Sequence, residues 1–387
     1  MKKNVLKKVL ALVFVLALAV GTLAGCEKKT DGGSTDGGSA ANGGTIMWLS
    51  NLSSGPQYEA QKAYAEYLCD QMGYDFKVVY GDSQNDPDGN LQAVKNGMTS
   101  DVVGLILSQD GGVANIMEEY PDLWVVGHNS DFNSIYSDIP QVATSASVKD
   151  NEKWLGTLAD GHIDGNDTAQ QMFDYIKAQG WKSVGIVSFP GFAYPNLQVA
   201  SAKLVELCEA AGIQVPGGAV EIMFQPLEES YFQEAGRGDL DAVVGLCAGT
   251  SFVYPTLLQA KADGLCAEKT KLVTSGFDSD PSLIADVGEN GTIAYLSISP
   301  NEDIAYGLTL LDLAIKGELY DDFVSERIDA AEYVIDSADD VNAVMEMTMM
   351  GTDDPEDAQI SYEDLQAITS FADLQALFLG VSVDDIK

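Results

Sequence analysis

The chain has 387 residues, of which 59 are acidic and 21 basic, so its formal net charge at pH 7 is −38. A surface this acidic repels phosphate backbones, and we expect no nucleic-acid partner. With 46% hydrophobic residues, the chain is long and apolar enough for two sizeable lobes rather than one small core.

The first 25 residues have the pattern of an export signal. Four lysines precede an apolar run from Val9 to Val20, which is shorter than the about 18 residues that a membrane span needs. Leu23–Cys26 follows and resembles the lipobox of bacterial lipoproteins. The resemblance implies that residues 1–25 are removed and that Cys26 carries a lipid anchor at the outer face of the cell membrane. The alternative is an ordinary secretory signal with a chance cysteine.

Residues 26–44 predict a flexible tether. This stretch holds six glycines among Ser, Thr, Asp and Asn, and has too little apolar surface to offset the entropy of ordering. It would let an anchored domain move while staying close to a membrane partner.

From Thr45 onward, short apolar runs alternate with longer amphipathic ones, the pattern of parallel strands covered by helices. The first series predicts strands and helices, in chain order, at Thr45–Ser50, Pro56–Gly73, Phe76–Tyr80, a helix opened by Asp86-Pro87, Val102–Ser108, Gly112–Tyr120 and Leu123–Gly127.

A second series begins near Lys149 and has the same construction. Its expected elements are Thr168–Gly180, Ser183–Ser188, Asn196–Gly212, Val220–Phe224, Ala242–Cys247, Phe252–Gly264, Leu272–Gly276, Pro281–Val287, Thr292–Ile298 and Glu302–Lys316. The sequence therefore predicts an α/β fold of two doubly wound parallel-sheet lobes.

Four segments resemble the type I periplasmic solute-binding proteins, which include ribose- and galactose-binding proteins. They are Gly81–Pro87, Asp150-Asn151, Gly276–Asp278 and Thr292–Gly307, and the likeness covers nearly all of Thr45–Lys316. It implies a hinge between an N-terminal lobe of residues 45–147 with about 299–330 and a C-terminal lobe of residues 148–298. A local likeness at Met117–Gly127 is to the nucleoside-binding basic membrane proteins.

Ligands of open α/β sheets bind at the carboxyl ends of the strands, so the residues just past each strand are the candidate site. In the first lobe, the ligand-binding candidates are Gln57, Tyr58, Gln109, Asp110, Asn129 and Asp131, with His128 beside them. Tyr58 could stack on a sugar ring or simply pack on a neighbouring loop. Asp110 could bind hydroxyls or cap the following helix.

In the second lobe, the ligand-binding candidates are Phe192, Tyr194, Thr250, Phe252, Asp278 and Ser299. Aromatic rings in the loop after Ser188 suggest a flat ligand, although Phe189 and Phe224 could equally bury the loop. Asp278 matches a family position that binds ligand hydroxyls, or else caps a helix. At Gly249-Thr250 the chain departs from the Asn-Asp of sugar-binding relatives.

The loop Phe189–Asn196 lacks the family's arginine, which predicts a neutral or weakly charged ligand, a monosaccharide first and a nucleoside second. The sequence holds no phosphate-binding glycine loop with lysine, no nucleophile elbow and only two histidines, so we expect no enzyme. The cysteines after Cys26 have no metal-site or redox spacing, and we expect no cofactor or metal.

Residues 331–387 extend beyond the usual end of the family and predict an acidic, partly helical C-terminal extension. Ser361 with Asp364 and Ser370 with Asp373 have capping-box spacing, and Val341, Val344, Met345 and Met349 suggest another helix. These helices could pad the lobes or dock on a membrane partner.

The expected protein is a monomeric, lipid-anchored receptor that binds a small solute by lobe closure. It would deliver the solute to an ABC permease and ATPase on separate chains. The alternative is a sensor of the same fold that presents its closed form to a membrane kinase or chemoreceptor.

Overall fold

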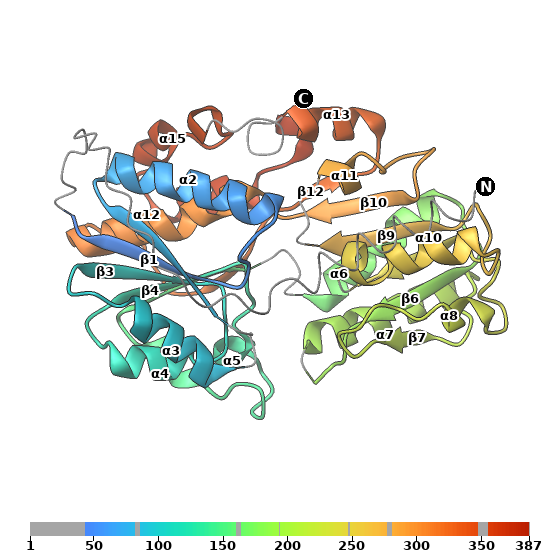
Figure 1. Ribbon diagram of the computed structural model, residues 1–387, viewed down its shortest axis with the longest axis horizontal. Helices are drawn as coiled ribbons and strands as arrows, with labels where there is room; N and C mark the ends of the chain where they lie inside the picture. The colour runs from blue at the N-terminus through green and yellow to red at the C-terminus, as the bar shows by residue number, and fades with distance from the viewer. Residues whose placement is uncertain are drawn as a thin grey trace, which may run out of the picture. The chain divides into compact units, whose positions relative to one another are not determined.

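The computed structural model describes residues 43–81, 86–159, 164–192, 194–246, 248–276, 281–346 and 355–386. Within these ranges the chain forms two six-stranded sheets with helices between successive strands (Figure 1). The expectations for Cys26, residues 27–42 of the tether, Cys247, Asp278 and Met349 lie outside the described residues.

The first sheet has the strand order β11-β5-β4-β3-β1-β2, and all of its paired strands are parallel. Its strands are β1 (Thr45–Ser50), β2 (Asp75–Tyr80), β3 (Val102–Leu107), β4 (Trp124–His128), β5 (Trp154–Ala159) and β11 (Arg327–Asp329). Strands β1 and β5 are buried along their whole length, as expected when helices cover both faces of a parallel sheet.

Alternation along the strands separates two cores. In β1, Ile46 and Trp48 belong to one buried cluster, while Met47 and Leu49 belong to another. The first face is covered by α2 (Pro56–Met72) and α12 (Ile304–Lys316), and the second by α3 (Pro87–Gly97) and α4 (Val113–Glu119). The short α5 (Asn133–Tyr136) and η1 (Ala146–Asp150) follow β4.

The second sheet has the order β12-β10-β9-β8-β6-β7, with only β12 antiparallel to its neighbour. Its strands are β6 (Val184–Ser188), β7 (Ala219–Glu221), β8 (Ala242–Gly245), β9 (Lys271–Gly276), β10 (Ile293–Ile298) and β12 (Tyr333–Ile335). The helices among them are α6 (Gly165–Ala178), α7 (Pro195–Ala210), α8 (Ser230–Gln233), α9 (Gly249–Phe252), α10 (Tyr254–Ala262) and α11 (Pro281–Ile284).

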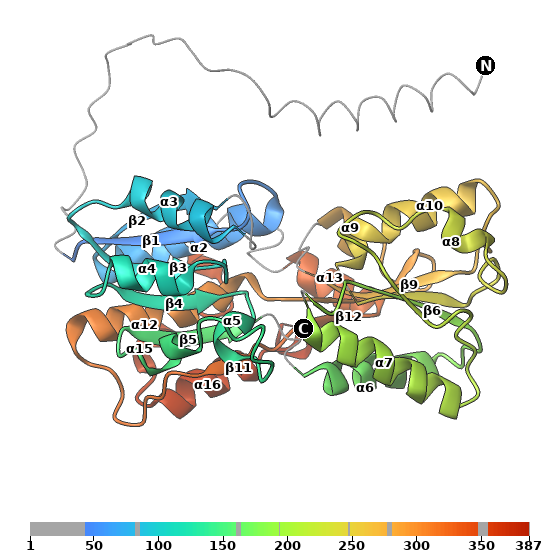
Figure 2. The same cartoon turned by 90° about the horizontal axis from the view of Figure 1, so that it is seen from below.

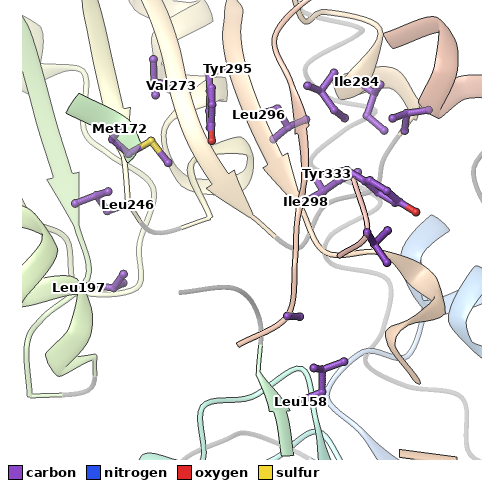
Figure 3. Packing of buried hydrophobic residues seen from close by; sticks show 14 of the residues in the cluster. Leu158, Met172, Leu197, Leu246, Val273, Ile284, Tyr295, Leu296, Ile298 and Tyr333 are labelled. Carbon is purple, nitrogen blue, oxygen red and sulfur yellow. The ribbon is translucent and has the colours of Figure 1, made fainter. Parts of the chain in front are cut away.

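The apolar residues of the second sheet pack as one core with its helices. Figure 3 shows Val273, Tyr295 and Leu296 on adjacent strands, with Met172 of α6 close by. This cluster continues into the α2 and α12 side of the first sheet and into the C-terminal region.

Two parallel-sheet lobes with interleaved helices confirm the predicted fold class. One predicted boundary is wrong: β5 joins the first sheet, although residues 148–298 were assigned to the second lobe. The run Trp154–Ala159 is apolar throughout, and such a run marks a buried parallel strand without indicating which of two similar sheets it joins.

The helix signals in the sequence are confirmed at their ends. Pro56 occupies the first turn of α2, and Gly73 ends that helix with a left-handed φ of 86°. Asp86 caps α3 by accepting a hydrogen bond of 2.9 Å from the backbone N–H of Gly89.

The region after Lys316 contributes to both sheets before it becomes helical. Strand β12 lies in the segment expected to be only partly helical, and it pairs with β10. Beyond it come α13 (Ala338–Glu346), η3 (Pro355–Asp357), α15 (Tyr362–Ala367), α16 (Phe371–Leu379) and η4 (Val383–Asp385). Three residues are too short a run for a strand signal in the sequence.

The predicted caps of the last helices are present. Ser361 and Asp364 form a reciprocal capping box on α15, and Ser370 caps α16 through the backbone N–H of Asp373. Of the helices in the described ranges, none has the length and apolar character needed to cross a membrane.

Candidate functional site

In the first lobe, the predicted residues gather at the carboxyl ends of three adjacent strands. Gln57 and Tyr58 lie in the first turn of α2 after β1, Gln109 and Asp110 follow β3, and Asn129 with Asp131 follows β4. Because β4, β3 and β1 are neighbours in the sheet, the three loops leave the same edge. Figure 2 shows β1, β3 and β4 side by side in this lobe.

An aromatic and polar row crosses these strand ends. The indole N–H of Trp48 donates a 2.9 Å hydrogen bond to Ser108 Oγ, and the rings of Trp48 and His128 form a T-shaped pair with centroids 6.1 Å apart. Tyr58 stacks on Trp48 at 5.9 Å and shares a hydrogen bond of 2.5 Å with the hydroxyl of Tyr80. The Tyr58 side chain is 2% exposed, so its ring is already occupied by a protein partner.

Several buried polar atoms at this edge have no hydrogen-bond partner among the described residues. They are Gln57 Nε2, Gln109 Oε1, Asn129 Oδ1 and both ring nitrogens of His128. A buried polar atom left unpaired costs about 1–3 kcal/mol, and most such atoms in folded proteins are paired. A ligand or water that reached them would recover part of that cost.

The His128 imidazole is neutral at physiological pH. Burial lowers its pKa to about 3, because the charged form loses its hydration in the interior. A neutral ring offers one acceptor and one donor nitrogen, which suits a hydroxyl group.

The loop after β4 is organised by Asp110 and Arg327. Asp110 accepts hydrogen bonds from the backbone N–H of Ser134, at 2.9 Å, and from its hydroxyl. Burial raises the pKa of Asp110, and the Ser134 bonds partly oppose the shift. Arg327 donates from Nη1 to the carbonyl oxygen of Asp131 at 2.9 Å and to Asn133 Oδ1 at 3.2 Å.

In the second lobe, the predicted loop after β6 carries an aromatic cluster. Phe189 is at its centre, with ring centroids 5.5 Å from Tyr194, 5.1 Å from Phe224 and 5.1 Å from Phe252. Phe189 is buried, whereas Phe192 is 70% exposed, with its ring centroid 6.5 Å from that of Phe224. The exposed ring of Phe192 therefore suits stacking on a ligand better than the buried ring of Phe189.

The remaining predicted residues of this lobe occupy other strand ends. Thr250 lies buried in α9 after β8, and Ser299 lies buried just after β10. Asp278, which follows β9, is outside the described residues.

A side-chain hydrogen bond joins the two sets of loops. Asn196, at the start of α7 after β6, donates from Nδ2 to Asp131 Oδ2 at 3.2 Å, and Asn133 donates to the same oxygen at 3.4 Å. Asp131 follows β4, so the contact joins the carboxyl edges of both sheets.

Backbone strain in the described residues concentrates at the same edges. The residues other than glycine with positive φ are Asn129 (48°), Phe132 (45°), Phe224 (56°) and Ala248 (42°), and they follow β4, β7 and β8. Left-handed backbone is costly for such residues and clusters at functional sites.

A separate pocket of about 490 Å³ lies at the opposite edge of the first sheet. Tyr120, Trp124 and Ile315 are among its lining residues, and Trp124 begins β4 rather than ending it. The pocket therefore lies away from the loops described above. Within the described ranges, no group of three or more His, Cys, Asp or Glu side chains could hold a metal ion.

Sequence reasoning missed the contributions of Trp48, Arg327 and Asn196. Trp48 lies inside an apolar strand, where a ring is normally read as core. Arg327 comes from a short strand far along the chain, and no local pattern predicts that it supports the loop at Asp131. Asn196 was included only as the start of a helix.

The fold is that of the type I periplasmic binding proteins, as comparison with solved structures shows. A galactofuranose-binding protein aligns with 12% identity and a TM-score of 0.57, over 80% of this chain and 99% of that protein. A carbohydrate transporter solute-binding protein from Agrobacterium radiobacter, in complex with D-arabinose, aligns with 14% identity and a TM-score of 0.53, over 85% and 99%.

An ABC transporter solute-binding protein from Burkholderia graminis, also in complex with D-arabinose, aligns with 15% identity and a TM-score of 0.52, over 78% of this chain and 97% of that protein. No protein-family model matches the chain, and the search of curated proteins found no match. At identities of 12–15% the structural likeness establishes the fold alone.

Proposed function

We propose that this protein binds a small neutral sugar between the carboxyl edges of its two sheets and serves as the solute-binding component of an ABC importer. The observation that carries the proposal is the pairing of buried, unpartnered polar groups at the first edge with an exposed aromatic ring at the second. Such a combination suits a sugar, because a sugar presents hydroxyls around the edge of its ring and an apolar ring face.

The polar edge suits a neutral ligand better than a charged one. The neutral His128 ring and the amides of Gln57, Gln109 and Asn129 can each donate or accept to a hydroxyl. Arg327 already donates to the loop at Asp131 and Asn133. A carboxylate or phosphate ligand would need a cationic partner, and Arg327 is already engaged by these hydrogen bonds.

The structural relatives support the same ligand class. Three of them are described as a galactofuranose-binding protein and two solute-binding proteins in complex with D-arabinose. A nucleoside remains the second ligand class, since the aromatic cluster around Phe189 would also suit a flat base.

The cellular part of the proposal rests on the leader. A lipobox ending in Cys26 and a glycine-rich tether would place the binding domain at the outer face of the cell membrane, next to a permease. Binding rather than catalysis is proposed, because the hydrogen bonds among the described residues at these edges pair no nucleophilic side chain with a base.

A thermal-shift screen of the purified protein tests the proposal. D-Arabinose, D-galactose, D-ribose, adenosine and glycine would be compared, because binding to the native state raises the melting temperature. We expect at least one sugar to shift it and glycine to have no effect. Phe192→Ala should reduce the shift, whereas Leu258→Ala, a half-exposed position on α10, should not.

The contrary results are equally specific. A shift by adenosine alone would replace the sugar with a nucleoside. No shift by any of these compounds, with the protein folded, would contradict the proposed ligand class.

A further inference from the structure

The C-terminal region after β12 packs on both lobes in turn. Helix α13 packs against β12 and α11 of the second lobe, and η3 then packs against α2 of the first. Helix α16 stays on the first lobe, where Phe378 lies 5.6 Å from Tyr306 of α12. The last turn, η4, returns to β12 and α13 of the second lobe.

The chain thus passes between the lobes repeatedly near the hinge. Within the described residues it does so between β10 and α12, between β11 and β12, and again between α16 and η4. Figure 3 shows Tyr333 of β12 beside Ile298 at the end of β10, and the two residues pair in register.

The segment Pro355–Ile386 is attached on both sides by buried apolar groups. On the first lobe its buried residues include Leu365, Phe371, Leu374 and Phe378, and on the return it buries Val381 and Val383. The backbone N–H of Phe371 donates to Asp322 Oδ1 at 2.8 Å, and Ala331 N–H donates to the carbonyl of Phe378 at 3.2 Å. Burial of this extent makes the segment part of the folded core rather than a loose tail.

The same segment covers two adjacent acidic residues at the hinge. Glu302 and Asp303 lie in η2 (Asn301–Asp303), between β10 and α12, and each is 1% exposed. None of their four carboxyl oxygens has a hydrogen-bond partner among the described residues. The backbone N–H of Gln359 faces Glu302 without reaching good hydrogen-bond geometry.

Side chains of two elements hold the segment at Gln359 and Ile360, where it passes Glu302. Tyr64 of α2 donates its hydroxyl to the carbonyl of Ile360, and Tyr333 of β12 donates to Gln359 Oε1. Glu332, whose charge also raises the pKa of Asp303, accepts a hydrogen bond from the hydroxyl of Ser297 on β10. Gln359, which faces Glu302, is therefore held from both lobes, by β12 directly and by α2 through its neighbour Ile360.

We propose that Pro355–Ile386 is a clamp across the hinge, seated on the buried Glu302–Asp303 pair, which limits how far the two lobes separate. Opening a hinge requires the segments that cross it to rotate together. A crossing segment resists that rotation when each of its ends is packed into a different lobe, because one end must then leave its apolar contacts. The clamp would favour nearly closed lobes even without ligand.

The acidic pair makes the clamp sensitive to protons. Burial raises the pKa of Glu302 to about 7 and that of Asp303 well above its usual value, with Glu302 and Glu332 adding to the latter. Tyr64 is neutral and so adds no charge. Loss of a proton from Glu302 places an unpaired charge under the clamp, which should loosen it as pH rises through about 7.

The test lengthens the last crossing without removing any side chain. Six Gly/Ser residues would be inserted between Gly380 and Val381, and the same insert placed after Gly180, in the turn that follows α6 within the second lobe, is the matched control. Small-angle scattering of the ligand-free full chain reports lobe separation, and hydrogen exchange reports protection at residues 298–304.

We expect the Gly380 insert to increase the radius of gyration and to speed hydrogen exchange at the hinge by roughly tenfold. The faster exchange would result from a lower free energy of local opening. The Gly180 insert should change neither. Equal scattering and equal hinge exchange in both variants would overturn the clamp.

Glu302→Gln supplies a second variant that retains the shape of the side chain. Wild-type protein should have a larger radius of gyration at pH 8.5 than at pH 5.5, and E302Q should have the small radius at both. A wild-type radius of gyration that does not depend on pH would contradict the role of the acidic pair in holding the clamp. Since both readouts are made without ligand, failure of the proposed sugar binding would leave this test unaffected.

Discussion

The two sheets end in different chemistry, although they are built alike. The first sheet ends in buried polar side chains with atoms that have no hydrogen bond within the described residues, such as Gln109 Oε1 and both ring nitrogens of His128. The second ends in an aromatic cluster around Phe189 whose outermost ring, Phe192, is exposed. The proposed ligand would therefore find hydrogen-bonding groups on one lobe and an exposed ring face on the other, and would contact both lobes.

The largest expected effect separates the two phenylalanines of the aromatic edge. Phe189→Ala should lower the free energy of unfolding by about 3–5 kcal/mol, the usual cost of deleting a buried ring. Phe192→Ala should change it by less than about 0.5 kcal/mol, because the ring is mostly exposed. Urea unfolding measures both. Similar losses in the two variants would contradict the division into a structural and a binding ring.

The hinge acid should make stability depend on pH. Glu302 has a folded-state pKa of about 7, above that of an exposed glutamate, so the folded protein binds the extra proton between about pH 4.5 and 7. Its contribution is therefore full at low pH and is lost as pH rises through that window. Comparing E302Q with wild type, we expect a relative change of about 3 kcal/mol between pH 4.5 and 8.

Thermal unfolding of both proteins across this range isolates the Glu302 contribution from that of the other acids. Parallel stability curves would show that Glu302 titrates normally. The same experiment with Glu318→Gln, an exposed position after α12, is the control and should give parallel curves.

The polar edge should have the opposite pH dependence. Burial lowers the folded-state pKa of His128 to about 3, so the unfolded chain binds a proton there below about pH 6.5 and the folded one does not. Stability from this group is present above pH 6.5 and falls by about 1.4 kcal/mol for each unit below it. His128→Gln should therefore be less sensitive to acid than wild type between pH 6 and 4.

Direct observation of the ring is also practical. The chain has only two histidines, so imidazole NMR signals can be assigned with the His128→Gln variant. A His128 signal that titrates near pH 6.5 would contradict its burial as a neutral group.

The smallest effect concerns the contact between the edges. Asn196→Ala removes the 3.2 Å hydrogen bond to Asp131, which is worth about 0.5–1.5 kcal/mol. We expect faster ligand release with little loss of stability, measured by stopped-flow fluorescence of the four tryptophans. Val199→Ala, an exposed neighbour on α7, should leave release unchanged.

Much of the fold could be predicted from periodicity, and the site only in part. Pro56, Gly73 and Asp86 marked helix ends correctly because caps act locally. The sheet to which β5 belongs depends on contacts distant in sequence, as does the reach of Arg327 to Asp131. The positions of the strand ends were enough to predict the candidate residues. Which of Phe189 and Phe192 is exposed for binding depends on burial, which no local sequence pattern encodes.

The most direct measurement is calorimetric titration of the sugar that gives the largest thermal shift into wild type, Gln109→Leu and Phe192→Ala. We expect saturable binding to one site and an affinity that is lower by roughly tenfold or more in each variant, since each removes one interaction worth about 1.4 kcal/mol from a different lobe. Unchanged affinity in either variant, with the protein folded, would contradict a site shared by the two edges.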